Sequence, residues 1–282
     1  MVRSFSALVC CALLFLSTPA IADSASDDDY AARMAREHQD DTPEPAAAAG
    51  DSAEAGVATS EVAYWEGHDV AGYLATPSGG AAKGGVIVIQ EWWGLNDNIR
   101  TMARRFAQEG YAALAVDLYE GGVATTRDEA MALMGTARDN TERLKDNLRA
   151  AHGYLTSTVG VSDVGSVGWC FGGGWSLQTA VMLGDSLDAA VIYYGRVVAD
   201  ESLSTVSAPV LGHFGSEDQG IPIEGVRAFE GKMQELGKDV TVHVYEGANH
   251  AFANPSGTRY QPEAATQAWE RTLAFFARHL DG

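Results

Sequence analysis

A single cysteine lies at the centre of a glycine-rich pattern that is typical of a catalytic nucleophile. Residues 168–174 read GWCFGGG, which matches G-x-S-x-G with Cys170 in place of the serine. An apolar run at 164–169 precedes this pattern and a helical pattern at 175–183 follows it, so the cysteine is expected on a sharp turn. The helix dipole there favours a thiolate, and the N–H of Phe171 can stabilise an oxyanion. The pattern predicts a thiol nucleophile, and the alternative is a buried structural cysteine.

A thiol nucleophile needs a base, and the base needs an acid that orients it. After such a turn the expected chain order is nucleophile, acid, base. Asp218 and His250 each follow a predicted strand and continue this order after Cys170. Glu217 is the competing acid, and Asp218 is favoured over it. No two histidines have the spacing of metal ligands, so no metal site is expected. The remaining histidines fall in the N-terminal region, a turn, helices and strands, namely His38, His68, His152, His279, His213 and His243.

Short apolar strands alternate with amphipathic helices over residues 61–282. This alternation predicts an α/β fold with a mostly parallel central sheet of about eight strands and helices on both faces. In such sheets functional residues gather at the carboxyl ends of the strands. Strands are expected at 62–64, 70–75, 86–89, 111–116, 164–169, 189–194, 210–214 and 240–245, and helices at 96–109, 126–134, 140–155, 175–183, 223–236 and 263–280.

Together these motifs make residues 61–282 resemble the dienelactone hydrolase family of α/β-hydrolases. The resemblance implies an α/β-hydrolase fold and a Cys-His-Asp triad that cleaves a small ester or lactone, as in a carboxymethylenebutenolidase. No cofactor is expected. The resemblance is carried by the segments 90–96 (QEWWGLN), 117–119 (DLY), 168–173 (GWCFGG), 193–195 (YYG), 250–252 (HAF) and 270–273 (ERTL), with Asp218 and Pro222.

The resemblance also implies a role for Glu91, which follows the buried strand at 86–89. In the family this carboxylate holds the resting thiol neutral until bound substrate displaces it and lets it deprotonate the thiol. The alternative is that Glu91 only caps the next helix. The N–H of Trp92 is the expected second oxyanion donor, beside that of Phe171.

Substrate-binding residues are expected from a partial match to the family pattern. Members that act on dienelactone carry two arginines that clamp the substrate carboxylate. Arg127 keeps one of them, whereas Asn254 stands at the place of the other, four residues after the catalytic histidine. Met131 and Met134 replace two aromatic residues of the pattern, which implies a softer apolar pocket. Trp93 is also expected to line it.

Two further arginines, Arg196 and Arg259, are candidate counter-charges for an anionic substrate. Ordinary surface charge is the favoured interpretation for both. Trp92 is expected beside the pocket, whereas core packing is favoured for Trp169.

The first 22 residues predict a secretory signal peptide. Arg3 supplies the positive start, residues 7–16 form an apolar run too short to span a bilayer, and the AIA at 20–22 predicts cleavage after Ala22. An uncleaved membrane anchor is the alternative. We therefore expect a periplasmic or secreted protein that keeps no stable membrane anchor after cleavage. Cys10 and Cys11 would leave with this segment, so that one cysteine remains.

Residues 23–60 form a separate compositional zone ahead of the hydrolase-like domain at 61–282. The zone holds 10 acidic residues against 2 basic ones, two prolines and a run of alanines at 46–49. This composition predicts a disordered acidic spacer rich in Ala and Asp. Residues 28–39 could form a short helix, but no sustained apolar face supports one.

The net charge restricts the partners of the protein. The chain carries 38 acidic and 19 basic residues, a formal net charge of -19, which disfavours nucleic acids and anionic membranes. We expect a small ester or lactone substrate, neutral or anionic, and favour a monomer. The alternatives are an acyltransferase or peptidase on the same triad and, with less support, a non-catalytic binding protein.

Overall fold

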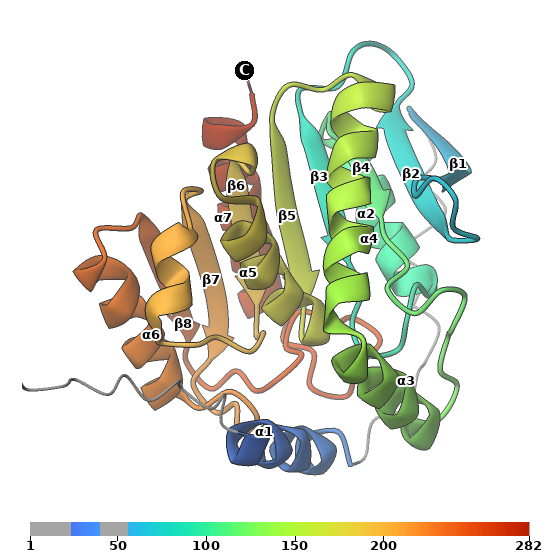
Figure 1. Cartoon of the computed structure of the whole chain (residues 1–282). Coiled ribbons are helices and arrows are strands. Elements are labelled where there is room, and N and C mark those ends of the chain that lie inside the picture. Colours follow the sequence, from blue (N-terminus) through green and yellow to red (C-terminus); the bar gives the residue numbers. More distant parts are fainter. Residues whose placement is uncertain (1–23, 40–55, 282) are drawn as a thin grey trace, which may run out of the picture.

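The computed structural model describes residues 24–39 and 56–281, which are organised around one eight-stranded sheet (Figure 1). The order across the sheet is β1-β2-β4-β3-β5-β6-β7-β8. The mostly parallel sheet predicted from the sequence is therefore confirmed. The strands are β1 Val57–Ala63, β2 Ala71–Pro77, β3 Gly85–Ile89, β4 Ala112–Ala115, β5 Val164–Trp169, β6 Ala189–Tyr193, β7 Val210–Gly215 and β8 Val240–Tyr245.

The pairing of the strands places the predicted reactive loops at one edge of the sheet. β1 pairs antiparallel with β2 and β2 with β4, whereas all the other neighbours are parallel. The register sets Trp169 at the end of β5 beside Tyr193 of β6, which in turn lies beside His213 of β7. Residues that follow these strands therefore emerge together, at the carboxyl edge of the sheet.

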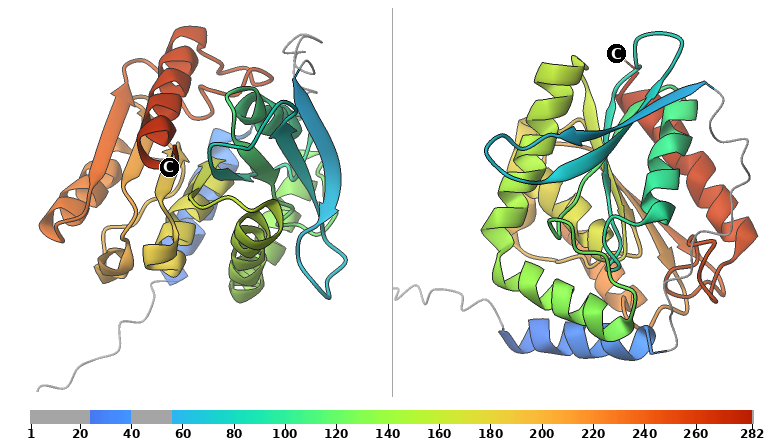
Figure 2. Two further views of the ribbon diagram at one scale, coloured as in Figure 1. Left: turned by 90° about the horizontal axis from the view of Figure 1, so that it is seen from above. Right: turned by 90° about the vertical axis from the view of Figure 1, so that its right-hand side faces the viewer.

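Helices cover both faces of this sheet, with α4, α5 and α6 on one face and α2 and α7 on the other (Figure 2). The helices of the main body are α2 Asp97–Gln108, α3 Arg127–Asp139, α4 Thr141–Tyr154, α5 Phe171–Leu183, α6 Ile223–Glu235 and α7 Pro262–His279. Short turns of other helical types occupy Leu155–Val159, Gly184–Ser186 and Glu201–Thr205.

The burial of β3 explains why its sequence is apolar at every position. Val86 and Val88 pack into the same cluster as Phe106 of α2, whereas Ile87 and Ile89 pack into the cluster that contains Leu148 of α4. Because successive side chains point to opposite faces, a strand covered on both sides needs apolar residues throughout.

An additional helix, α1 (Ser24–Glu37), lies across the carboxyl edge of the sheet, beside α3 (Figures 1 and 2). The expectation of a disordered spacer at 23–60 is wrong for this part, and β1 begins at Val57, inside the expected spacer. Tyr30, Met34 and His38 follow one another at intervals of four residues, which places them on one side of the helix. Met34 and His38 are both buried. These three residues form a stripe that is too narrow to be recognised in the sequence as an apolar face. The stripe nevertheless contacts the rest of the protein.

Within residues 24–39 and 56–281, no helix combines the length and apolar character needed to cross a bilayer. The predicted signal peptide at 1–22 lies outside the described residues, as do residues 40–55 of the expected spacer.

Candidate active site

Cys170 occupies a tight turn between β5 and α5, as the glycine pattern predicted. Its φ of 53° and ψ of -114° lie in a region that non-glycine residues rarely adopt. The carbonyl of Cys170 accepts from the N–H groups of Gly173 and Gly174 at 3.0 and 3.2 Å. A Cβ on Gly168 would overlap the carbonyl of Gly172, and one on Gly172 would overlap the end of β3. The glycines therefore permit the close approach that the turn requires.

The base and the acid meet in loops after β8 and β7. Nδ1 of His250 lies 2.8 Å from Oδ2 of Asp218, and both side chains are fully buried. Oδ1 of Asp218 accepts from the N–H of Ile221 at 2.8 Å, which fixes the carboxylate. Glu217, the competing acid, is exposed. The structure thus brings Asp218, and not Glu217, to the imidazole.

The electrostatics of the site favour a charged pair of sulfur and imidazole. Burial by itself would raise the pKa of Cys170, but the nearby charge of His250 outweighs it and, with a smaller contribution from His38, lowers the pKa to about 6. Burial would lower the pKa of His250, yet the charges of Asp218 and Cys170 raise that pKa well above its ordinary value. Burial would likewise raise the pKa of Asp218, and His250 holds it below the usual value instead. The arrangement therefore suits a thiolate beside an imidazolium.

Glu91 is buried next to this group, but a different residue holds it. Nδ2 of Asn254 donates to Oε2 of Glu91 at 2.7 Å. The sequence alternative of a helix cap does not apply, because the side chain of Asn96 caps α2 by accepting from the N–H of Ile99. Asn254, predicted near the substrate because of its place after His250, binds Glu91 here, and its contact with a substrate stays a prediction.

The two expected oxyanion donors come from the starts of two segments at the carboxyl edge. Phe171 is the first residue of α5, where N–H groups have no partner within the helix. Trp92 follows β3, and its buried ring packs with Trp93 and with Met134 of α3. Trp93 and Met134 both belong to this apolar cluster, and their contact with a substrate stays a prediction. Met131 differs, since it is 39% exposed on the outer side of α3.

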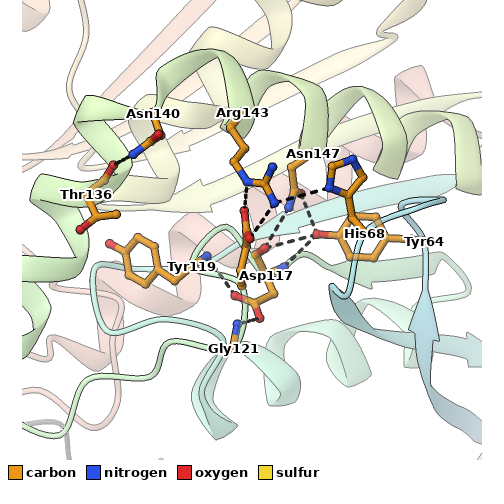
Figure 3. Close-up of polar contacts among 10 residues, drawn as sticks. Tyr64, His68, Asp117, Tyr119, Gly121, Thr136, Asn140, Arg143 and Asn147 are labelled. Atoms are coloured by element: carbon orange, nitrogen blue, oxygen red, sulfur yellow. Dashed lines mark hydrogen bonds and ion pairs between the residues drawn. The ribbon is translucent and has the colours of Figure 1, made fainter.

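A polar network fixes the turn that begins at Asp117, after β4 (Figure 3). The side chain of Asp117 accepts from the N–H groups of Tyr119 and Gly121, while its backbone carbonyl accepts from Nδ2 of Asn147 at 2.9 Å. The hydroxyl of Tyr64 donates to Oδ1 of Asn147 at 2.6 Å. The chain beyond this turn reaches the tryptophan pair, where the N–H of Ala124 donates to the carbonyl of Trp93 at 2.9 Å. The DLY motif at 117–119 therefore has a structural role beside the site.

The main residue that sequence reasoning missed is His38, at the end of α1. Its Nε2 lies 3.6 Å from Sγ of Cys170. Its ring lies over Trp92 with centroids 4.3 Å apart and meets His250 edge-on at 4.9 Å. The spacing of His38 with Met34 and Tyr30 was the one available signal.

The three arginines considered for substrate binding all contact α1. Nη2 of Arg127 donates to the carbonyl of Ala35 at 3.0 Å. The guanidinium of Arg196 lies over the ring of Tyr30, 4.9 Å from its centroid. Arg259 binds the carboxylate of Glu37 at 3.1 Å and also its carbonyl. Ordinary surface charge was therefore the wrong interpretation for Arg196 and Arg259, because both hold the helix against the site.

Comparison with known proteins places this geometry in a family context. Residues 70–280 match the Dienelactone hydrolase family. "Protein usf" of Aquifex pyrophilus is 36% identical over 222 residues, which cover 76% of this chain and 95% of that protein. The "Putative carboxymethylenebutenolidase" of Saccharolobus solfataricus is 33% identical, again over 76% of this chain and 95% of that one.

A solved structure extends the similarity to three dimensions. The "Putative Dienelactone Hydrolase" from Klebsiella pneumoniae is 27% identical, with a TM-score of 0.73 over 79% of this chain and 99% of that chain. The matched residues 70–280 include the loops of Cys170, Asp218 and His250, whereas α1 lies outside them.

Proposed function

Because this chain belongs to the dienelactone hydrolase family, we propose that it is an exported thiol hydrolase that cleaves a small ester or lactone. The observation that carries the proposal is the buried pair of Asp218 and His250, at 2.8 Å, beside the sulfur of Cys170. Nucleophile, base and orienting acid are the parts that acyl transfer through a covalent intermediate requires.

The proposed reaction runs in two halves. The thiolate of Cys170 attacks the carbonyl carbon, and the carbonyl electron pair moves onto oxygen. The N–H groups of Phe171 and Trp92 stabilise this oxyanion. When the tetrahedral intermediate collapses, the ester C–O bond breaks and the imidazolium of His250 gives its proton to the leaving oxygen. An acyl-thioester on the cysteine remains.

The second half regenerates the enzyme. The neutral imidazole of His250 takes a proton from water while the water oxygen attacks the thioester carbonyl. The C–S bond then breaks, the carboxylic acid leaves and the thiolate of Cys170 returns. Asp218 keeps the imidazole in one orientation and stabilises its positive form in both halves.

The substrate is proposed to be small and largely apolar around the reacting carbonyl. Trp93 and Met134 supply an apolar wall. Arg127 is the remaining half of the family's carboxylate clamp and donates to the carbonyl of Ala35 on α1. A panel of lactones and esters, each with and without a carboxylate, tests the clamp on the wild type and on Arg127→Ala. Equal rates on charged and neutral substrates would remove Arg127 from the substrate site.

Export is proposed on the sequence alone. Arg3, the apolar run at 7–16 and the small residues before Asp23 form the expected signal. The mass of the protein recovered outside the cytosol of a bacterial host tests this point. A chain that begins at Asp23 supports the proposal, and a chain that retains Met1 contradicts it.

The hydrolase proposal is tested by mixing the protein with an activated aryl ester. We expect a burst of aryl alcohol and a matching mass gain on Cys170, both absent in Cys170→Ala. If Cys170→Ala still hydrolyses the ester, the proposed mechanism is wrong. Adding a competing amine or alcohol separates water from other acyl acceptors. Free acid as the main product supports a hydrolase rather than an acyltransferase.

A further inference from the structure

The helix α1 is fixed over the reactive loops by contacts that run from Tyr30 to its C-terminal end. Arg196 lies over Tyr30 near the middle of the helix, and Arg259 binds Glu37 at its C-terminal end. Between them Met34 is 2% exposed, and its sulfur lies so close to Gly220 that a side chain there would clash with it. The helix therefore has a defined position on the domain. Its contact at Gly220 lies two residues along the chain from the acid Asp218.

The seated helix brings a polar ring into the catalytic cluster. His38 is 2% exposed, and its Nε2 lies 3.6 Å from the Cys170 sulfur, within the range of a hydrogen bond to sulfur. Trp92 supports one face of the ring, while His250 contacts it edge-on. A buried imidazole held in this way points one defined nitrogen at the nucleophile.

The surroundings of the other nitrogen decide which one carries the proton. Nη2 of Arg259 lies 3.4 Å from Nδ1 of His38. A guanidinium can only donate hydrogen bonds, so Nδ1 acts as the acceptor. In a neutral imidazole the proton is then on Nε2, the nitrogen that faces the sulfur.

The same contact argues against a different interpretation of the cluster. His38, Cys170 and His250 offer three ligand atoms within 4.8 Å of one another, a set that would suit a soft metal ion. A metal-bound histidine normally donates its other N–H to a carboxylate or carbonyl. Here Nδ1 of His38 faces the donor Arg259 instead, which favours a proton on Nε2 over a metal ion.

We propose that His38 is an active-site residue whose Nε2–H donates a hydrogen bond to the Cys170 sulfur, so that α1 completes the site of the free enzyme. The proposal rests on the proposed function only in treating this sulfur as the nucleophile. A hydrogen bond to the charged form stabilises a thiolate, so the bond makes the free enzyme's thiol more acidic. Because Cys170 is 2% exposed and the ring lies against its sulfur, the ring must move aside when a substrate carbonyl approaches.

Other ionisable groups besides His38 lie around the sulfur of Cys170. Burial, with the charge of Cys170 adding to it, raises the pKa of Tyr30, Tyr119 and Tyr194, so these phenols remain neutral. The groups that carry charge near the sulfur are His250 with Asp218 behind it, Arg259 behind His38, Arg196 and Arg33 beside Tyr30, and Glu91 beside Asn254.

The test measures how the rate of Cys170 alkylation by iodoacetamide depends on pH in the mature chain. His38→Phe keeps an aromatic ring over Trp92 but removes the donor. We expect it to raise the pH midpoint by about one, the value of one hydrogen bond to a charged group. His38→Gln restores an N–H donor and is expected to return the midpoint towards that of the wild type. Arg36→Gln changes an exposed residue of the same helix and is the matched control.

The midpoint and the plateau rate of alkylation report different things. An unchanged midpoint in His38→Phe with a faster plateau shows that His38 only covers the sulfur, and it overturns the proposal. Alkylation needs no turnover. If the alkylation test contradicts the role of His38, the proposal that Cys170 carries hydrolysis still stands. If Cys170→Ala still hydrolyses the ester, the proposed function is wrong, but the hydrogen bond from His38 to the sulfur is not affected.

Discussion

The amide of Asn254 lies 2.7 Å from the carboxylate of Glu91, and this contact orients a buried carboxylate that follows β3. At the place of Asn254 the related dienelactone-cleaving enzymes are expected to hold a clamp arginine. A neutral amide at this position binds Glu91 without adding a positive charge. The sulfur of Cys170 can then ionise against the imidazoles, while Glu91 is held by a hydrogen bond.

Removing this contact should make the thiol less acidic. Asn254→Ala removes a hydrogen bond that positions the carboxylate of Glu91, and a like charge that comes closer to the sulfur disfavours the thiolate. We expect a higher pH midpoint for alkylation and a lower kcat/KM near neutral pH. Adding Glu91→Gln to Asn254→Ala should restore the midpoint. An unaltered midpoint in Asn254→Ala would show that Glu91 does not act on the thiol.

The pH dependence of the reaction should follow the thiol. The pKa of Cys170 is lowered to about 6, and the reactive form is the deprotonated one. Below this pH the sulfur binds a proton and cannot attack, so kcat/KM should rise through about pH 6 and level off above it. The imidazolium of His250 stays protonated over this range because its pKa is raised well above the ordinary value. The ultraviolet absorbance of the thiolate, followed in parallel, should show the same midpoint, and a midpoint near 9 in both measurements would contradict the charged pair.

The orienting acid should matter nearly as much as the base. Asp218→Asn keeps the shape of the acid but removes the charge that holds the imidazole in its productive form. A loss of about 10³-fold or more in kcat is expected from what such a change does in other triads. Glu217→Gln is the matched control, because Glu217 is the neighbouring, exposed acid and should retain nearly full activity. Similar losses in both variants would show that the pairing seen at 2.8 Å is not the functional one.

The packing of α1 against the domain should control access to the sulfur of Cys170. Met34→Ala removes a buried side chain that packs at Gly220, and a substitution of this kind costs roughly 2 kcal/mol or more where the side chain is well packed. Met34 belongs to the same buried apolar cluster as residues of the sheet, but it is carried by α1, which lies outside the sheet and its covering helices, so the cost falls first on the docking of α1. The plateau rate of alkylation should therefore rise roughly tenfold or more, with little change in the melting temperature. A large fall in the melting temperature would instead make α1 part of the folding core.

Cys170, Asp218 and His250 could be predicted from the sequence because each follows a strand of a parallel sheet. The carboxyl ends of such strands meet at one edge, so local strand patterns already place these residues together. The strands themselves were visible because burial on both faces leaves an unbroken apolar run, as at residues 86–89. The site thus follows from local patterns combined with one general rule of sheet topology.

His38 and the arginines could not be predicted in the same way. Among the described residues, the ring and apolar contacts of α1 come from Tyr30, Met34 and His38, at a spacing of four within an acidic segment. The contacts that stabilise it join residues far apart in the chain, such as Glu37 with Arg259. No local pattern shows which distant surface a short helix will contact. The sequence of α1 therefore indicated a disordered spacer.

The glycines around the nucleophile should be far less replaceable than those elsewhere. A Cβ on Gly172 would overlap the carbonyl oxygens of Ile89 and Gln90, and these belong to or directly follow a central strand that cannot shift. Gly172→Ala should therefore lower the free energy of unfolding by about 1–3 kcal/mol and reduce activity, since the overlap pushes α5 away from the turn. Gly231→Ala is the matched control, because Gly231 is an exposed residue of α6 with open space at its Cβ. There the substitution should be neutral or stabilise the protein by about 0.5–1 kcal/mol. Chemical denaturation of both variants checks the contrast, and equal stability of the two would mean that strand and helix are less closely packed at the nucleophile than the structure has them.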